Sequence, residues 1–365
     1  MEAYAKKRVL ILTTGGTIAG NVAQSKVSQH VESGANSFLT IVQDSCEIIR
    51  QNWGIEIETD VADLFNVDSS DMQPKNWTIL INKITELYDN FDAFLVLHGT
   101  NTMGYTTAAL SFALENINKP VIFTGAQVPL GYLGSDSTTN LINALRLAVW
   151  GYHPIKGVLA VFGSKIITGT RVKKGTDFDY DPFSSFISGA IGQIGRYIRI
   201  DETNLAKHVA YLSKYKPLAI QSRVLSVKPD FDTASIASIT EFPGMSPDIF
   251  QSLVENNGIK AFIFRAFGAG DPSMTQMRAF KYLKKKRIPI IVTTQAASGL
   301  ASFQVNASGK YLKDNDLAIP AYDMSMECMV TKMGWLLAQN KNYTSINSMM
   351  LTDLHGEVRV ENEMI

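Results

Sequence analysis

Short apolar runs alternate with segments of helical periodicity along the first half of the chain. The runs predict buried strands at Val9–Leu12, Phe94–Leu97, Pro120–Thr124 and Gly157–Phe162. Apolar residues three or four positions apart predict helices at Ser37–Trp53, Gln73–Tyr88, Tyr105–Asn116 and Asn140–Val149. This alternation favours a doubly wound, mainly parallel sheet with right-handed crossovers.

The pattern loosens between Asp201 and Pro229, where polar, proline-containing sequence indicates a connection that could include some helix. A second, smaller βα set follows, with strands near Ala237–Thr240, Ala261–Ala266 and Pro289–Thr293 and helices near Asp248–Glu255, Thr275–Lys285 and Asp323–Gln339. A chain of 365 residues is long enough for two cores. We therefore expect an α/β protein with a larger N-terminal catalytic domain (1–205), a connection (206–234) and a smaller C-terminal α/β domain (235–365).

Composition narrows the class of protein. Lys+Arg and Asp+Glu balance at 34 each, so no net charge attracts nucleic acid or an anionic membrane. The two cysteines form no CxxC pair, and the five histidines lack metal-ligand spacing. The apolar stretch after Lys6–Arg8 is too short for a signal peptide, and no segment could span a membrane. We expect a soluble cytoplasmic protein without metal, cofactor, nucleic-acid or membrane partner.

Two threonine–glycine clusters, Thr14–Gly20 and His98–Met103, each follow a predicted strand. Parallel strands place their chemistry at their carboxyl ends, so these hydroxyls are expected to come together. The first cluster is neither G-x-G-x-x-G nor a P-loop, and no acidic residue caps a convincing second strand after it. Its glycines could present N–H groups to a small anion, or form only a plain βα turn.

A threonine hydroxyl attacks poorly unless a neighbour takes its proton. A desolvated lysine, or a polarised tyrosine or histidine, could act as that base. Lys173 and Lys174 follow a further strand-to-loop transition at Gly169–Val172. Burial and cationic neighbours can lower the pKa of a lysine enough for this role. These patterns do not choose between the two lysines, and both could instead be solvated surface residues.

Several motifs together resemble the bacterial-type L-asparaginase family. They follow the family order across nearly the whole chain: Thr14–Ile18, Asp68–Met72, His98–Met103, Gly125–Leu130, Gly169–Lys174, Phe267–Gly270 and Asp323–Glu327. The likeness is greatest to the cytoplasmic type I branch, especially at Asp68–Met72 and Ala109–Asn116. The resemblance implies a two-domain protomer that forms a homodimer or a dimer of dimers, with active sites near an intimate dimer contact.

The resemblance also implies roles for individual residues. Thr17 matches the nucleophile, Thr100 the second catalytic threonine and Lys174 the lysine beside it. The implied substrate-binding residues are Gly16, Ser69, Ser70 and Ala126, of which the serines hold the α-carboxylate and Ala126 supplies a carbonyl near the amide. The implied reaction is attack on the side-chain amide of L-asparagine, with L-glutamine weaker, followed by ammonia release and hydrolysis of a threonine ester.

Position 101 departs from the family pattern, because Asn101 stands where the motif carries aspartate. In the family that aspartate binds the substrate's α-ammonium and supports the threonine–lysine pair. Replacing it by an amide removes a charge-assisted hydrogen bond worth roughly 1.5–3 kcal/mol. A neutral Asn101 could instead suit a substrate that lacks a free α-amino group.

The segment after Thr17 departs as well, because no tyrosine occurs between Gly20 and Leu39, where the family carries a lid tyrosine. His30 falls near that place in an ungapped alignment. Its ordinary pKa near neutrality would suit a base. The alternative is an exposed loop histidine without a role.

Two features of the C-terminal half bear on the same resemblance. Asp271 stands where relatives carry asparagine, in a loop that in the family reaches the partner's active site. Asn101 and Asp271 could therefore be an exchanged amide–acid pair. Arg265 and Thr294 fit the pattern of a type I effector site, although Ala296 replaces the expected cysteine.

Three functional hypotheses follow. The leading one is an L-asparagine amidohydrolase. The second is a catalytically impaired homologue that binds or senses an amino acid, because the family aspartate and tyrosine are replaced. The third is the glutaminase-like component of a tRNA-dependent amidotransferase, which normally needs an added N-terminal domain for which no room is expected before Val9.

Overall fold

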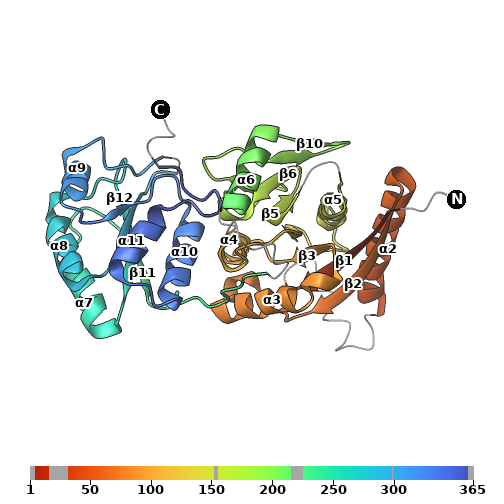
Figure 1. The fold of residues 1–365 in the computed structure, drawn as a ribbon, viewed down its shortest axis with the longest axis horizontal. Coiled ribbons are helices and arrows are strands. Elements are labelled where there is room, and N and C mark those ends of the chain that lie inside the picture. Colours follow the sequence, from red (N-terminus) through yellow and green to blue (C-terminus); the bar gives the residue numbers. More distant parts are fainter. Residues whose placement is uncertain (1–4, 16–31, 152–154, 215–224, 298, 361–365) are drawn as a thin grey trace. The chain divides into compact units, whose positions relative to one another are not determined.

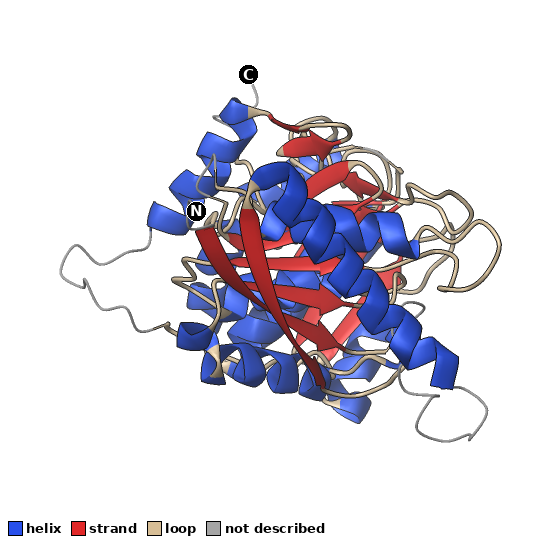
Figure 2. Cartoon of the chain, turned by 90° about the vertical axis from the view of Figure 1, so that its right-hand side faces the viewer, coloured by secondary structure: helices blue, strands red, loops and turns tan. Residues whose placement is uncertain are grey.

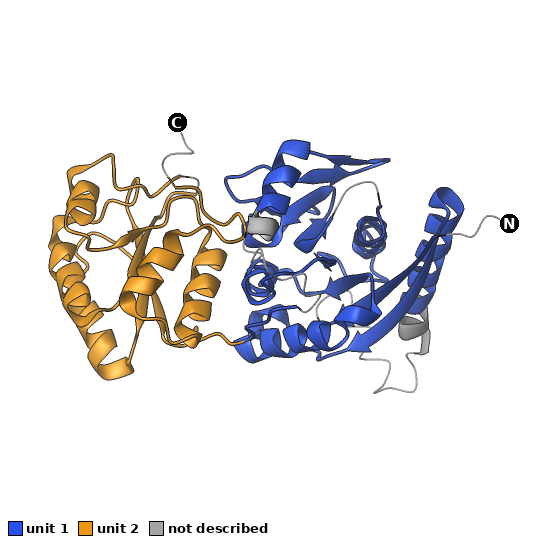
Figure 3. Ribbon diagram, in the orientation of Figure 1, with its two compact units in different colours: residues 1–229 blue, residues 230–365 orange. Residues whose placement is uncertain are grey.

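The computed structural model describes residues 5–15, 32–151, 155–214, 225–297 and 299–360 (Figure 1). The chain divides into two compact units, Met1–Pro229 and Asp230–Ile365 (Figure 3). Unit 1 contains a large, mainly parallel sheet and unit 2 a smaller parallel sheet, each with helices. The predicted fold class is therefore confirmed.

Eight described strands form the large sheet of unit 1, in the order β10-β9-β6-β5-β4-β3-β1-β2. They are β1 (Ala5–Thr13), β2 (Ile55–Asp63), β3 (Ala93–Leu97), β4 (Pro120–Thr124), β5 (Gly157–Phe162), β6 (Lys165–Thr168), β9 (Gly192–Ile194) and β10 (Ile198–Ile200). Strands β1 to β5 pair in parallel, whereas β6, β9 and β10 add an antiparallel edge. Strands β7 (Val172–Lys174) and β8 (Phe183–Ser185) form a separate hairpin.

Helices cover both faces of this sheet (Figure 2). They are α2 (Glu32–Trp53), α3 (Pro74–Glu86), α4 (Met103–Ala113), α5 (Ser137–Ala148) and α6 (Glu202–Lys214). Buried residues of α2 and α5 belong to one cluster with Val9 and Ile11 of β1. On the other face Phe94 of β3 stacks on Tyr88, which follows α3, and α3 packs on α4. The central strands are buried from both sides, which explains their uninterrupted apolar sequence.

Strand β2 corrects the sequence analysis, which found no convincing second strand after the first glycine-rich cluster. Along Ile55–Asp63 half-buried residues largely alternate with exposed ones, and β2 pairs with β1 at one edge of the sheet. An edge strand with one covered face needs apolar residues only at every second position. It therefore lacks the continuous apolar run that identified β1, β3, β4 and β5.

Unit 2 is a smaller α/β unit with a parallel sheet ordered β11-β12-β13-β14. Its strands are β11 (Ile236–Thr240), β12 (Ala261–Ala266), β13 (Ile290–Thr294) and β14 (Ile319–Pro320), and its helices are α7 (Asp248–Asn257), α8 (Met277–Lys286), α9 (Ala307–Asp314), α10 (Met326–Ala338) and α11 (Tyr343–Leu351). The aromatic rings of Phe250, Phe264 and Phe280 pack against one another in its core. Across the described residues of both units, no helix has the length and apolarity to cross a membrane.

Candidate active site

The two threonine–glycine clusters begin side by side at the carboxyl ends of β1 and β3. The chain places β2 on one side of β1 and β3 on the other, so the strand order reverses between β1 and β3. Ligands of open α/β sheets bind at such a reversal. The backbone N–H and the hydroxyl of Thr14 both donate to the Leu97 carbonyl, at 3.2 and 2.9 Å. The predicted residues Gly16, Thr17 and His30 lie outside the described residues.

A short 3₁₀ turn after β2, Ser69–Asp71, brings two predicted serines to the loop after β3. Ser69 is buried, and its Oγ accepts a hydrogen bond from the Asn101 N–H at 3.2 Å. Its carbonyl accepts from the Thr102 hydroxyl at 2.7 Å. A Cβ on Gly99 would stand 2.6 Å from Ser69 Oγ, so this close approach requires glycine.

Lys174 connects the catalytic candidates of this site. It is the last residue of β7, and its Nζ lies 2.9 Å from both Thr100 Oγ1 and Asn101 Oδ1. Burial lowers the pKa of Lys174 below its ordinary value, while the charge of Asp177 opposes that shift. Lys173 is the preceding strand residue, and alternation along a strand turns it to the opposite face. Of the two lysines, Lys174 is the one that contacts Thr100.

Asn101 is held on both sides. Its Oδ1 accepts from Lys174, and its Nδ2 donates to Ser70 Oγ at 3.0 Å. A protonated lysine offers only hydrogen-bond donors, so the oxygen of the Asn101 amide must face it. The structure thus places an uncharged acceptor beside the Lys174 amine.

Changing Asn101 to aspartate is expected to raise the pKa of Lys174. An opposite charge at hydrogen-bond distance favours the ammonium form of Lys174. The neutral amide of Asn101 supplies no charge to offset the burial of this lysine. The titration of a ¹³C-labelled Lys174 ε-carbon in both proteins measures the change. An unchanged or lower pKa in Asn101→Asp would show that residue 101 does not control the charge of this lysine.

A second set of contacts fixes the loop that follows Lys174. Gln127 Nε2 donates to the carbonyls of Asp177 and Asp179 at 3.1 and 3.2 Å. The Asp136 carboxylate accepts from the N–H groups of Gln127 and Val128 at 3.0 and 2.9 Å. The sequence analysis did not single out Gln127 or Asp136. An aspartate directly before a helix was the available signal, although the Asp136 side chain bonds the Gln127 and Val128 N–H groups instead of capping α5.

His98 and Ala126 complete the described edge of the sheet. The His98 N–H donates to the Thr124 carbonyl at 2.9 Å, which joins the ends of β3 and β4 immediately before buried Ala126. Burial lowers the pKa of His98 to about 4, so the ring is neutral at pH 7. Its Nδ1 lies 2.7 Å from the Gly99 carbonyl and can donate to it, which supports the loop that carries Thr100.

Comparison with known proteins identifies the family. The model described as "Asparaginase, N-terminal" matches residues 8–206, and that described as "Glutaminase/Asparaginase C-terminal domain" matches residues 235–350. The chain belongs to the asparaginase family. The resemblance carried by its motifs is therefore confirmed.

Three relatives illustrate the range of this asparaginase-family match. L-asparaginase 1 of Escherichia coli (strain K12) is 34% identical over 298 residues, which cover 80% of this chain and 82% of that protein. The structure of L-asparaginase I from Vibrio cholerae superimposes with a TM-score of 0.79 at 29% identity, covering 98% of this chain and all of that one. A glutamyl-tRNA(Gln) amidotransferase component of Pyrococcus abyssi is 27% identical, over 96% of this chain and 76% of that protein.

The other predicted residues of this asparaginase-family chain lie in unit 2. Asp271 is 8% exposed, and its Oδ2 accepts from Asn306 Nδ2 at 2.5 Å and from the Ala269 N–H at 3.2 Å. The Thr294 hydroxyl donates to the Gly268 carbonyl at 2.6 Å, and Arg265 is half-buried on β12. These contacts join Asp271 to Asn306, which precedes α9, and Thr294 at the end of β13 to the loop of Gly268. The roles predicted for Asp271, Arg265 and Thr294 stay predictions.

Proposed function

We propose that this asparaginase-family protein hydrolyses the side-chain amide of L-asparagine or a related small amide, with L-glutamine as a weaker substrate. The contact that carries the proposal is the 2.9 Å hydrogen bond between Lys174 Nζ and Thr100 Oγ1 at the strand-order reversal. Burial lowers the pKa of this lysine, which favours the neutral amine that can accept a proton. A threonine beside such a base suits acyl transfer.

In the proposed reaction Thr17 Oγ attacks the amide carbon, the C–N bond breaks, and ammonia leaves with the proton that Thr17 gave up. Water then attacks the resulting ester, and Thr17 regains its proton as the acid is released. Lys174 and Thr100 carry protons between these steps. N–H groups near Gly16 stabilise the developing oxyanion. Ser69 and Ser70 hold the α-carboxylate, Ala126 offers its carbonyl to the amide, and residue 101 faces the α-nitrogen.

The proposal includes self-association in the cytoplasm as a homodimer or a dimer of dimers. It needs no cofactor, because threonine and lysine side chains suffice for the proton transfers. Within the described residues no group of three or more His, Cys, Asp or Glu side chains could hold a metal ion. We propose His30 as the base that assists Thr17. Asp271 is proposed to reach the active site from the partner protomer.

The test is product analysis with L-asparagine and L-glutamine. We expect ammonia and L-aspartate in equal amounts, and an acyl adduct on the Thr17 peptide after rapid acid quenching. Binding of L-asparagine by calorimetry without ammonia release would instead favour the impaired, amino-acid-sensing homologue. An adduct on another residue would contradict the assignment of Thr17.

The relationship to the glutamyl-tRNA(Gln) amidotransferase component supports a second candidate, ammonia production from L-glutamine for a partner enzyme. That function requires kcat/KM for L-glutamine to exceed that for L-asparagine. The same assay therefore separates the two, and a preference for L-asparagine contradicts the second candidate.

A further inference from the structure

The polar groups around Asn101 form a chain with a defined direction. Lys174 donates to Asn101 Oδ1, and Asn101 Nδ2 donates to Ser70 Oγ. The hydroxyl of Ser70 and its backbone N–H in turn bond the Asp68 carboxylate, which lowers the pKa of Asp68. Each donor in this series is aimed away from Lys174 and toward Asp68.

This direction leaves Asn101 with an N–H to offer to a ligand, because Lys174 already donates to its Oδ1. A primary amide nitrogen carries two hydrogens, and Ser70 accepts one of them. The second N–H is left for a ligand beside exposed Asn101. An ammonium group has no lone pair and cannot accept this bond. A carbonyl oxygen can accept it.

We propose that the substrate of this site is a β-amide whose α-nitrogen is acylated and uncharged, with its acyl carbonyl accepting from Asn101 Nδ2. This inference rests on the proposed function, in which residue 101 faces the α-nitrogen. The α-carboxylate and the amide that is cleaved are the same as in L-asparagine. Only the substituent at the α-nitrogen differs.

The experiment compares kcat/KM for ammonia release from N-acetyl-L-asparagine, L-asparagine and succinamate. Wild-type protein is expected to prefer N-acetyl-L-asparagine to L-asparagine. Succinamate lacks the α-nitrogen, so it should fall between them if the acyl carbonyl makes its own hydrogen bond. Asn101→Asp replaces the donor by a charged acceptor, and should lower the ratio of acetylated to free substrate by about ten- to a hundredfold.

The control variant is Asn257→Asp, which makes the same chemical change at an exposed residue at the end of α7 in unit 2. It should leave the ratio of the two substrates unchanged. A wild-type preference for L-asparagine, or a ratio that Asn101→Asp does not lower, would overturn this inference while leaving the amidohydrolase intact. If neither wild type nor Asn101→Asp releases ammonia from any of the three amides, the proposed function itself fails.

Discussion

Replacing Lys174 with methionine is expected to lower kcat/KM for ammonia release by about 10² to 10⁴-fold, the usual contribution of a positioned acid or base. Methionine has a similar length but cannot accept or return a proton. Lys174 Nζ lies 2.9 Å from Thr100 Oγ1, and burial lowers its pKa. Ammonia release is measured with whichever of N-acetyl-L-asparagine, L-asparagine and succinamate gives the highest kcat/KM in the wild type. The Thr17→Ala variant gives the background rate.

Lys173→Met is the matched control, since it removes the same group one residue earlier in β7. The antiparallel register pairs Lys173 with Ser184 and Lys174 with Phe183, so the two lysines occupy alternate positions. We expect less than about a threefold change for Lys173→Met, because this variant keeps the contact between Lys174 and Thr100. Equal losses in the two variants would point to damage of the hairpin instead of a loss of the base.

Lys174→Arg separates proton transfer from charge. Arginine keeps the positive charge but does not deprotonate in proteins, so it cannot replace a neutral amine. A loss as large as that of Lys174→Met supports the role of a base. Recovery to near wild-type activity would mean that a fixed positive charge suffices.

The parallel core of unit 1 could be predicted because burial on both sides leaves continuous apolar runs. The predicted strand Pro120–Thr124 coincides with β4, and Gly157–Phe162 with β5. The short strands β7 to β10 were not predicted, since each is only three residues long and several positions in them are exposed. In these strands the pairing partner, which the local sequence does not reveal, determines the structure.

The candidate site was predictable where a residue follows a buried strand, as Thr100 does. The choice of Lys174 over Lys173 without the family resemblance required the hairpin register. The contacts of Gln127 with Asp177 and Asp179 join residues about fifty positions apart, so no local sequence pattern predicts them. The direction of the hydrogen bonds at Asn101 likewise follows from its two neighbours in space and not from its neighbours in sequence.

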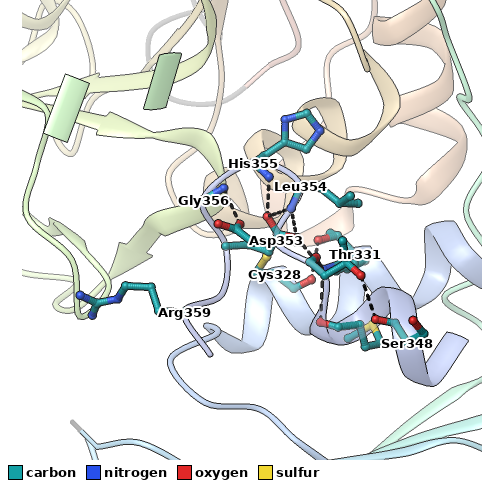
Figure 4. A network of polar contacts seen from close by, with 12 residues as sticks. Cys328, Thr331, Ser348, Asp353, Leu354, His355, Gly356 and Arg359 are labelled. Carbon is teal, nitrogen blue, oxygen red and sulfur yellow. Dashed lines mark hydrogen bonds and ion pairs between the residues drawn. The ribbon is translucent and has the colours of Figure 1, made fainter. Parts of the chain in front are cut away.

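A buried ion pair in unit 2 provides a test of stability. Lys332 of α10 and Glu357 have fully buried side chains, with Lys332 Nζ 2.5 Å from Glu357 Oε1. The same ammonium donates to the carbonyls of Met350 and Thr352 at 3.2 and 2.7 Å. Figure 4 shows the adjoining network, in which the Gly356 N–H bonds the Asp353 carboxylate. The pair thus ties the segment after α11 to α10.

Glu357→Gln is expected to lower the free energy of unfolding by roughly 3–5 kcal/mol, because it removes the carboxylate charge that pairs with the fully buried Lys332 ammonium. The carboxylate also accepts from the N–H groups of Leu354 and His355, and glutamine can keep only part of these bonds. Urea unfolding at pH 7 measures the loss. Glu86→Gln is the matched control, since Glu86 pairs with Lys83 on the surface and such pairs contribute about 0–1 kcal/mol.

The same pair predicts how stability depends on pH. Burial alone would raise the pKa of Glu357, but the charges of Lys332 and His355, together with its hydrogen bonds, lower it from 4.5 to about 2. A carboxylate with a depressed pKa stabilises the folded state above its unfolded value, and this contribution disappears as the pH falls from about 4.5 toward 2. The difference in unfolding free energy between wild type and Glu357→Gln should therefore shrink across that range. A difference that stays constant, or a loss no larger than that of Glu86→Gln, would show that the carboxylate charge of Glu357 does not stabilise this unit.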